Sequence, residues 1–425
     1  MTNKKVLSLF SGCGGMDLGF EGNFATFKNS INENLNGDWI EKELPNKKVL
    51  LKNTSFRIVF ANDINKYAKI SWSNYFSKYN YSPEIYHSDS IVNIINEHEN
   101  DDYEFPKNID VLTGGFPCQD FSLAGKRKGF FSSKSHDGKT LIDDKYLESR
   151  GNLYLWMIKT IEIVQPKIFV AENVKGLLTI KSAFETIRSD LNKINDNAYL
   201  VMPPRVLSTY EYGVPQLRER LIFIGFLKSS LTKKALKELS ADNVSPAYDP
   251  YPPKTHSLKP HRGSLLELNN LQKPNGLLRA VTCGDDLWDL EEPEATSDES
   301  QRHYSKAKFL TNSSQGQKEI SLDKPGPTIR SEHHGNIEFR RLSKAHGGAI
   351  TSELNQNLPE RRLTVRECAR IQTFPDDYDF VIKSRTNPVP ASEAYKVIGN
   401  AVPPLLAYNI AKNLEKKWEL YFGDK

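Results

Sequence analysis

Residues 109–119, with the sequence IDVLTGGFPCQ, read as a buried strand that ends in two glycines and then presents a Pro-Cys pair. The glycines let a ligand or another backbone approach closely, and Pro117 fixes φ directly before Cys118. Open α/β sheets bind ligands at the carboxyl edge of their parallel strands. A thiol at that edge could act as a nucleophile, although a lone buried cysteine is more often structural. The rest of the chain decides between these two interpretations.

Strand and helix signals alternate on both sides of this stretch, over residues 1–226. Apolar runs that predict strands lie at 6–10, 56–61, 109–112, 167–171 and 221–226. Residues 153–164 carry apolar side chains at helical spacing and end before Pro166. Strands that alternate with helices are typical of a doubly wound, mostly parallel sheet. The expected fold class is therefore α/β.

Two regions depart from this rhythm. Residues 22–55 are rich in Asn and Lys, and we expect them to form a surface insertion. Residues 227–359 show no βα rhythm, so they predict a second, smaller and irregular domain. The expected division is 1–226 for the first domain, 227–380 for the second domain with a hinge, and 381–425 for a segment that returns to the first. Within the last segment, residues 394–420 predict a strand or turn followed by a closing helix.

Composition narrows the class of protein. The 425 residues carry a net charge of +4 and are 38% hydrophobic, as in an ordinary globular protein. The chain lacks a run of about 18 apolar residues and a cleavable leader, which argues against a membrane span and against secretion. The four cysteines are scattered without CxxC spacing, so we expect neither zinc nor disulfides, and a cytoplasmic location.

Charge is distributed in clusters. Basic clusters lie at 126–128, 254–262, 340–341 and 361–362, and residues 285–299 are strongly acidic. Separated basic patches on a nearly neutral chain suit a protein that holds a polyanion on one face. Each cluster could equally be solvated surface charge.

A glycine loop at residues 10–15, FSGCGG, follows a predicted strand and opens a helix. Such a loop suits a nucleotide-like ligand, although the pattern is not GxGxxG. Asp63 ends the second strand, where an acid can accept both ribose hydroxyls. It lies 51 residues after Gly12, more than the usual ~20, and the insertion accounts for the excess. A glycine turn and a ribose-binding acid without a phosphate cradle favour an adenosyl ligand such as S-adenosylmethionine over NAD.

Two further sites carry polar chemistry. Glu172 leaves a buried strand at the expected edge, where desolvation suits a proton donor, although a solvated strand end is the alternative. Gln216, Arg218 and Arg220 alternate, so we expect them on one face of a strand. The two arginines there are either an ion-pair ladder or an anion clamp. The adjacent His333 and His334 lack partner spacing, and we expect no metal.

Six sequence blocks in one order resemble the DNA (cytosine-5) methyltransferase family of bacterial restriction–modification systems. The blocks are at residues 10–15, 115–119, 172–174, 216–220, 366–375 and 399–403. The resemblance covers essentially the whole chain. It implies the S-adenosylmethionine-dependent methyltransferase fold with a target-recognition domain, S-adenosylmethionine as methyl donor, and duplex DNA as substrate. It also implies functional pairing with a restriction endonuclease, and we expect a monomer.

The resemblance assigns roles to matching positions. Cys118 would add to C6 of a cytosine flipped out of the duplex, and Glu172 would hydrogen-bond N3 and the exocyclic amine. Arg220, with Arg218 behind it, would steady the base O2 and the carboxylate. The positions implied for the cofactor pocket are Phe10, Ser11, Gly12, Cys13, Gly14, Gly15, Asp63, Ile64, Asp89, Ser90, Pro117 and Asn400.

Two other functions remain open on this evidence. One is a tRNA cytosine-5 methyltransferase, which the size of residues 227–359 disfavours. The other is a catalytically silent DNA-binding homologue, which Cys118 and Glu172 disfavour because both stand in their expected contexts.

Residues 120–150, with three glycines and several basic side chains, predict a loop that closes over bound DNA. The DNA sequence recognised is not readable from the chain.

Overall fold

The computed structural model describes residues 3–116, 153–258, 276–311, 315–331 and 337–423. Eight strands of this described chain form one sheet in the order β10-β11-β8-β7-β1-β5-β6, with β9 beside β11. Pairings among β1, β5, β6, β7 and β8 are parallel, whereas those of β11 are antiparallel. The predicted mostly parallel sheet is confirmed. The strands are β1 (Lys4–Leu9), β5 (Phe56–Asn62), β6 (Tyr86–His87), β7 (Val111–Gly115), β8 (Ile168–Val174), β9 (Tyr199–Val201), β10 (Arg205–Ser208) and β11 (Glu219–Leu227).

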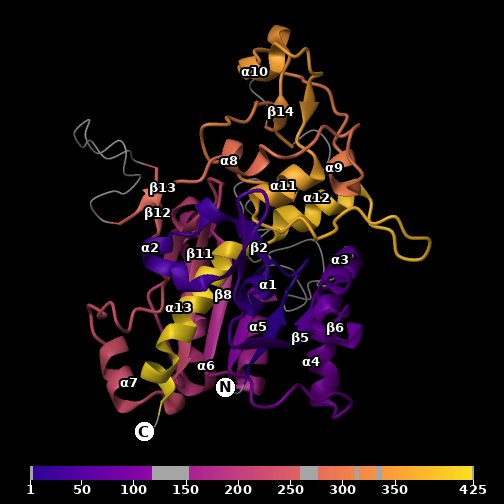
Figure 1. Ribbon diagram of the computed structural model, residues 1–425. Helices are drawn as coiled ribbons and strands as arrows, with labels where there is room; N and C mark the ends of the chain where they lie inside the picture. The colour runs from indigo at the N-terminus through magenta and orange to yellow at the C-terminus, as the bar shows by residue number, and fades with distance from the viewer. Residues whose placement is uncertain (1–2, 117–152, 259–275, 312–314, 332–336, 424–425) are drawn as a thin grey trace.

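Helices cover both faces of the sheet (Figure 1). Strand side chains alternate, so Val6 faces one apolar layer and Leu7 the other. The first layer includes α1 (Gly15–Glu21), α3 (Lys66–Phe76) and α13 (Pro404–Phe422). The second includes α4 (Ile91–Glu99), α5 (Leu153–Val164) and α6 (Lys181–Asn197). Helix α5 has the predicted bounds and ends before Pro166.

Residues 22–55, hereafter the 22–55 segment, are more than a surface insertion. They form α2 (Glu33–Asn36) and an antiparallel sheet ordered β2 (Ala25–Phe27), β4 (Lys48–Leu51), β3 (Ile40–Leu44). The ring of Tyr408 on α13 meets Phe24 and Trp39 edge-on, with centroids 5.7 and 5.3 Å apart. The segment interrupts the βα rhythm as expected, and its strand β3 is largely exposed, but a few apolar side chains among many polar ones pack it against α13.

Residues 228–252, placed by the sequence in the second domain, pack along α13. They include α7 (Lys233–Leu239). The Thr232 amide donates to the Tyr421 carbonyl at 2.9 Å, and Asn413 Nδ2 donates to the Pro250 carbonyl at 2.7 Å. This stretch therefore belongs with the sheet and its helices.

Between residues 276 and 371 the chain forms short elements without βα rhythm, which stand above the sheet in Figure 1. They are β13 (Leu278–Arg279), paired with β12 (His256–Ser257), α8 (Cys283–Leu287), α9 (Glu299–Arg302), β14 (Phe339–Arg341), α10 (Thr351–Leu354), β15 (Arg361–Arg362) and α11 (Val365–Ile371).

The basic clusters at 340–341 and 361–362 do not face solvent. Arg361 forms a two-bond pair with Glu367 at 2.8 and 2.9 Å and also contacts Glu292. Arg341 bonds Glu353 at 2.6 Å and also pairs with Glu292. All four arginines of these clusters are buried. The expectation that they hold a polyanion is therefore wrong. Acidic side chains, one of them from the 285–299 run, pair with Arg340, Arg341 and Arg361, and Arg362 donates to backbone carbonyls.

Residues 391–403 also differ from expectation. The predicted strand or turn at 394 is instead helix α12 (Ala391–Asn400), followed by a short link to α13. Residues Ala394, Tyr395, Val397 and Ile398 are buried, at the spacing of one helix face. Packing against α11 accounts for the helix.

Candidate active site

The carboxyl ends of the parallel strands meet at one edge of the sheet. Phe10 to Gly12 follow β1, and Asp63 and Ile64 follow β5. Asp89 and Ser90 come two and three residues after β6, and Glu172 lies near the end of β8. The predicted Pro117 and Cys118 lie outside the described residues, as do residues 120–150, His333 and His334.

The loop after β1 has an unusual backbone. Phe10 and Gly12 both have positive φ, 53° and 54°. A positive φ strains the backbone of a phenylalanine, and strain of this kind clusters at functional sites. A Cβ on Gly12 would meet no atom within 4 Å, whereas one on Gly14 would lie 2.5 Å from Trp72 and one on Gly15 2.2 Å from the Val402 carbonyl. Gly12 thus presents its backbone to open space, while Gly14 and Gly15 allow close packing.

Asp63 is fixed against this loop. Its carboxylate accepts the Gly12 amide at 3.0 Å and the Asn65 amide at 2.9 Å, one on each oxygen. Desolvation raises the pKa of Asp63, although these two amides oppose the shift. Each oxygen keeps a second lone pair for a ligand hydroxyl. Beside it, the apolar side chain of Ile64 is 41% exposed.

The remaining predicted cofactor positions join the same edge. Asn62 Nδ2 donates to the carbonyls of His87 and Asp89 at 3.1 and 2.8 Å, which fixes the end of β6 beside β5. Asn400 is exposed at the end of α12, two residues before the Val402 carbonyl that touches Gly15.

Two predicted cofactor positions turn their side chains into the protein. The Cys13 thiol is buried and contacts the Val397 carbonyl at 3.3 Å, and burial raises its pKa. Ser90 caps α4 by accepting the Val92 amide at 3.3 Å. Only the backbone of these residues is suited to a ligand.

Glu172 and Arg220 form the polar centre of the edge. Arg220 Nε lies 2.6 Å from Glu172 Oε1, and the two residues are 9% and 8% exposed. Gly115 pairs with Glu172 across β7 and β8, and a Cβ there would lie 2.9 Å from Glu172 Oε2. Asn173 Nδ2 donates to the Phe116 carbonyl at 3.2 Å. The glycine makes room for the carboxylate, and Asn173 fixes the chain where it leaves β7.

The QxRxR stretch confirms one part of the prediction and corrects another. Gln216, Arg218 and Arg220 are buried and Leu217 between them is exposed, as alternation predicts, but β11 begins only at Glu219. Arg218 is 1% exposed and donates to the carbonyls of Ile329, Gly399 and Ala401 at 2.8–2.9 Å. It forms neither an ion-pair ladder nor an anion clamp. Its hydrogen bonds instead link the start of β11 to the 326–331 stretch and to the end of α12.

Sequence reasoning missed Asp17 on α1. This fully buried carboxylate accepts Ser8 Oγ at 2.5 Å and Trp72 Nε1 at 2.8 Å. Ser8 in turn accepts Ser11 Oγ at 2.8 Å, so a chain of hydrogen bonds runs from the β1 loop to α3. Burial raises the pKa of Asp17 to about 6. The signal in the sequence was a pair of acids, Asp17 and Glu21, among the apolar residues of α1.

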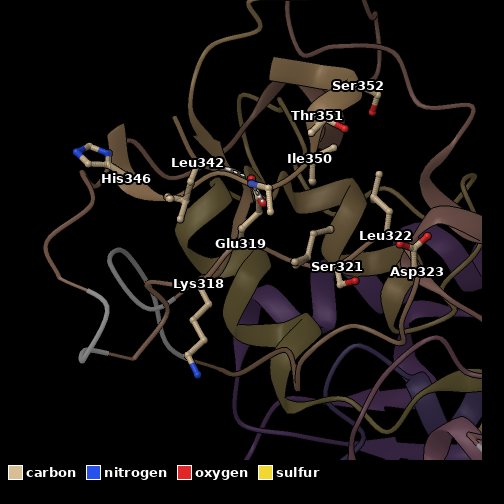
Figure 2. A pocket seen from close by; sticks show the side chains of 13 residues that line it. Lys318, Glu319, Ser321, Leu322, Asp323, Leu342, His346, Ile350, Thr351 and Ser352 are labelled. Atoms are coloured by element: carbon tan, nitrogen blue, oxygen red, sulfur yellow. Dashed lines mark hydrogen bonds between the residues drawn. The ribbon is translucent and has the colours of Figure 1, made fainter. Parts of the chain in front are cut away.

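A cavity of about 590 Å³ lies away from this edge, among residues 318–323 and 342–352 (Figure 2). Glu319 organises it by accepting the amides of Leu342 and Ala349, both at 2.8 Å. The cavity belongs to the irregular region and not to the polar centre at Glu172.

Comparisons with known proteins assign the chain to a family whose members have this fold. The C-5 cytosine-specific DNA methylase family matches residues 44–416, and the chain belongs to that family. The chain is 29% identical to the type II methyltransferase M.FnuDI of Fusobacterium nucleatum, over 97% of this chain and 94% of that protein. It is 31% identical to M.BsuRI of Bacillus subtilis, over 96% and 78%.

The fold has a solved counterpart in the S. pombe Dnmt2 methyltransferase, with a TM-score of 0.53 at 17% identity over 97% of this chain and 99% of that one. The predicted family, methyltransferase fold and enzyme class are confirmed. No helix in the described ranges is long and apolar enough to cross a membrane.

Proposed function

We propose that the protein transfers a methyl group from S-adenosylmethionine to C5 of a specific cytosine in duplex DNA, through a covalent adduct at Cys118. The observation that carries this proposal is the Glu172–Arg220 pair, buried at the sheet edge opposite Gly115. Cys118 follows Gly115 by three residues in the chain.

The residues at the edge fit the methyl donor. Gly12 leaves open space at its α-carbon, Asp63 keeps lone pairs for two ribose hydroxyls, and Ile64 offers an apolar surface for a flat base. Asp89 and Asn400 complete the same edge. When bound, S-adenosylmethionine supplies an electrophilic methyl group on a sulfonium.

The protein residues activate the cytosine. C5 of cytosine is a weak nucleophile, so Cys118 adds its sulfur to C6 while Glu172 hydrogen-bonds N3 and the exocyclic amine. Arg220 holds the carboxylate and faces the base O2. The addition makes the ring an enamine whose C5 accepts the methyl group. Loss of the C5 proton to a base and elimination of the thiol restore the ring. The target atoms lie inside the stack, so the base must be flipped out.

The partners follow from the family. The bacterial relatives bear the names of type II methyltransferases, which supports duplex DNA as substrate and functional pairing with a restriction endonuclease. Residues 253–380 are the proposed target-recognition region with its hinge, because residues 228–252 pack along α13, and the protein is proposed to act as a monomer in the cytoplasm. The structural likeness to Dnmt2 supports only the fold, and it does not favour tRNA over duplex DNA as the substrate.

The test is a covalent trap. Duplex carrying 5-fluorocytosine at the target should form a stable adduct with the wild-type protein and donor, because fluorine cannot leave C5 as a proton does. C118S should form no adduct and lose methyl transfer, while C283S, which changes a buried thiol in the irregular region, should keep both. Full activity in C118S, or methylation of tRNA but not duplex, would refute the proposal.

A further inference from the structure

The 22–55 segment meets the proposed target-recognition region at two separate places. The first is a ring of charges around Lys48 on β4. Lys48 Nζ pairs with Asp376 and lies 3.6 Å from Asp289. Arg370 on α11 pairs with the same two acids, at 2.7 Å for Asp376. Two cations and two acids therefore alternate in a closed ring.

The charges of the ring interact strongly with one another. Burial by itself would raise the pKa of Asp376, but the hydrogen bonds and charges of Arg370 and Lys48 hold it well below its ordinary value. Next to the ring, Lys47 Nζ lies over the Trp288 ring, 5.0 Å from its centroid. The turn between β3 and β4 is thereby fixed to the chain that follows α8.

The second place is around Asn32, at the start of α2. Asn32 is 1% exposed, and its Nδ2 donates to the carbonyls of Thr255 at 3.0 Å and Gly276 at 2.7 Å. His256 Nε2 lies 3.0 Å from the Asn29 carbonyl. One amide group thus joins two chain positions that are 21 residues apart in the sequence.

The body of the segment is seated on the catalytic part. Tyr408 on α13 donates to the Lys52 carbonyl at 3.0 Å, and the Thr54 amide donates to the Glu21 carbonyl at 3.0 Å at the end of α1. The segment is therefore a packed body that is attached both to the helices that cover the sheet and, at two places, to the recognition region.

We propose that the 22–55 segment is a brace that sets the position of the recognition region over the sheet edge, with Asn32 and Lys48 as its positioning residues. Two separated attachments fix an orientation, whereas a single one leaves a hinge. Neither residue belongs to the proposed donor pocket or to the Glu172–Arg220 centre. The inference rests on the proposed function, because it concerns how DNA is presented to that centre.

The test separates DNA recognition from donor binding. K48M removes the charge at nearly constant shape, and N32S removes the amide donor. Each should raise the KM for cognate duplex about tenfold and lower the ratio of cognate to near-cognate methylation about tenfold. The Kd for S-adenosylmethionine should stay within twofold of wild type. K48R should restore KM to within threefold, and K42M, on the exposed strand β3 of the same small sheet, should behave as wild type.

The outcomes are distinct. Folded K48M and N32S with wild-type KM and wild-type discrimination would overturn the brace. A parallel loss of donor affinity, duplex affinity and melting temperature would also overturn it, because it would show a merely structural role. If N32S does not fold, the comparison of K48M with K48R tests the brace by itself. Wild-type protein that methylates no duplex would instead refute the proposed function.

Discussion

The sheet edge and the region beyond residue 276 use charge in opposite ways. At the edge, Asp63 and Glu172 are held by one or two partners each and keep further lone pairs beside open space or a glycine. Beyond residue 276, Arg341 and Arg361 are surrounded by acids. Under the proposed function, charge at the edge is available to ligands, whereas charge in the second region replaces part of an apolar core.

This difference has an energetic consequence. The elements between residues 276 and 371 are too short to be stable by backbone hydrogen bonds alone. Glu367 shows how they are joined, since it pairs with Arg361 and also closes the capping box of α11 with Thr364. A buried pair that loses one partner leaves an uncompensated charge. We therefore expect changes at the edge to affect chemistry and changes in the second region to affect stability.

The largest expected effect is that of E172Q on catalysis. The amide cannot exchange a proton toward N3, so kcat should fall by about 10²- to 10⁴-fold, the usual range for general acid–base groups. Single-turnover transfer of a labelled methyl group to duplex measures it. The donor affinity should not change. E219Q, at an exposed neighbour that pairs with Lys175, is the matched control. An E172Q enzyme with near-normal turnover would contradict the assignment.

The next effect is that of E367Q on stability. Removal of this buried carboxylate should lower the free energy of unfolding by about 3–5 kcal/mol. Urea titration of the variant gives the value, and donor affinity of the folded protein should stay normal. E185Q breaks an exposed pair with Arg188 on α6 and should cost at most about 0.5 kcal/mol. Equal losses in the two variants would remove the distinction between the regions.

The third effect is a pH dependence of the unfolding free energy that arises from Asp17. Its pKa in the folded protein is about 6, above the ordinary value of 3.8, so the unfolded chain releases this proton first as pH rises. Asp17 should therefore lower stability progressively between about pH 4 and pH 6, by about 3 kcal/mol in total, with no further change above that window. The difference in unfolding free energy between wild type and D17N, followed across this range, isolates it. A difference that is constant with pH would show that Asp17 does not titrate there.

The smallest effect is that of G115A. Its methyl group would lie 2.9 Å from Glu172 Oε2, which must shift by a few tenths of an ångström. We expect kcat to fall about tenfold, which corresponds to about 1.4 kcal/mol. G114A is the control, since its methyl group meets the flexible end of Met157 at 3.2 Å. A larger loss of activity in G114A than in G115A would show that the backbone and not the carboxylate was disturbed.

The sequence predicted the sheet well because buried parallel strands read as apolar runs, as at 56–61 and 167–171. It also predicted that Asp63 and Glu172 share an edge, since the ends of parallel strands must meet there. The partners of Arg218 were not predictable, because they lie 111, 181 and 183 residues away in the chain. Arg341 and Arg361 were misplaced because patterning treats arginine as solvent-facing, and only the fold shows which acids surround it.

The close approach of Gly15 to Val402 has a consequence for synthesis. Gly19 makes a similar contact, since a Cβ there would lie 2.4 Å from Ala407 Cβ. Helix α13 is synthesised nearly 400 residues after α1. The packing behind the β1 loop is therefore completed only after α13 has been made. A nascent chain carries both Cys118 and Glu172 long before α13 supports the proposed donor pocket, so we expect no methyl transfer before α13 has folded.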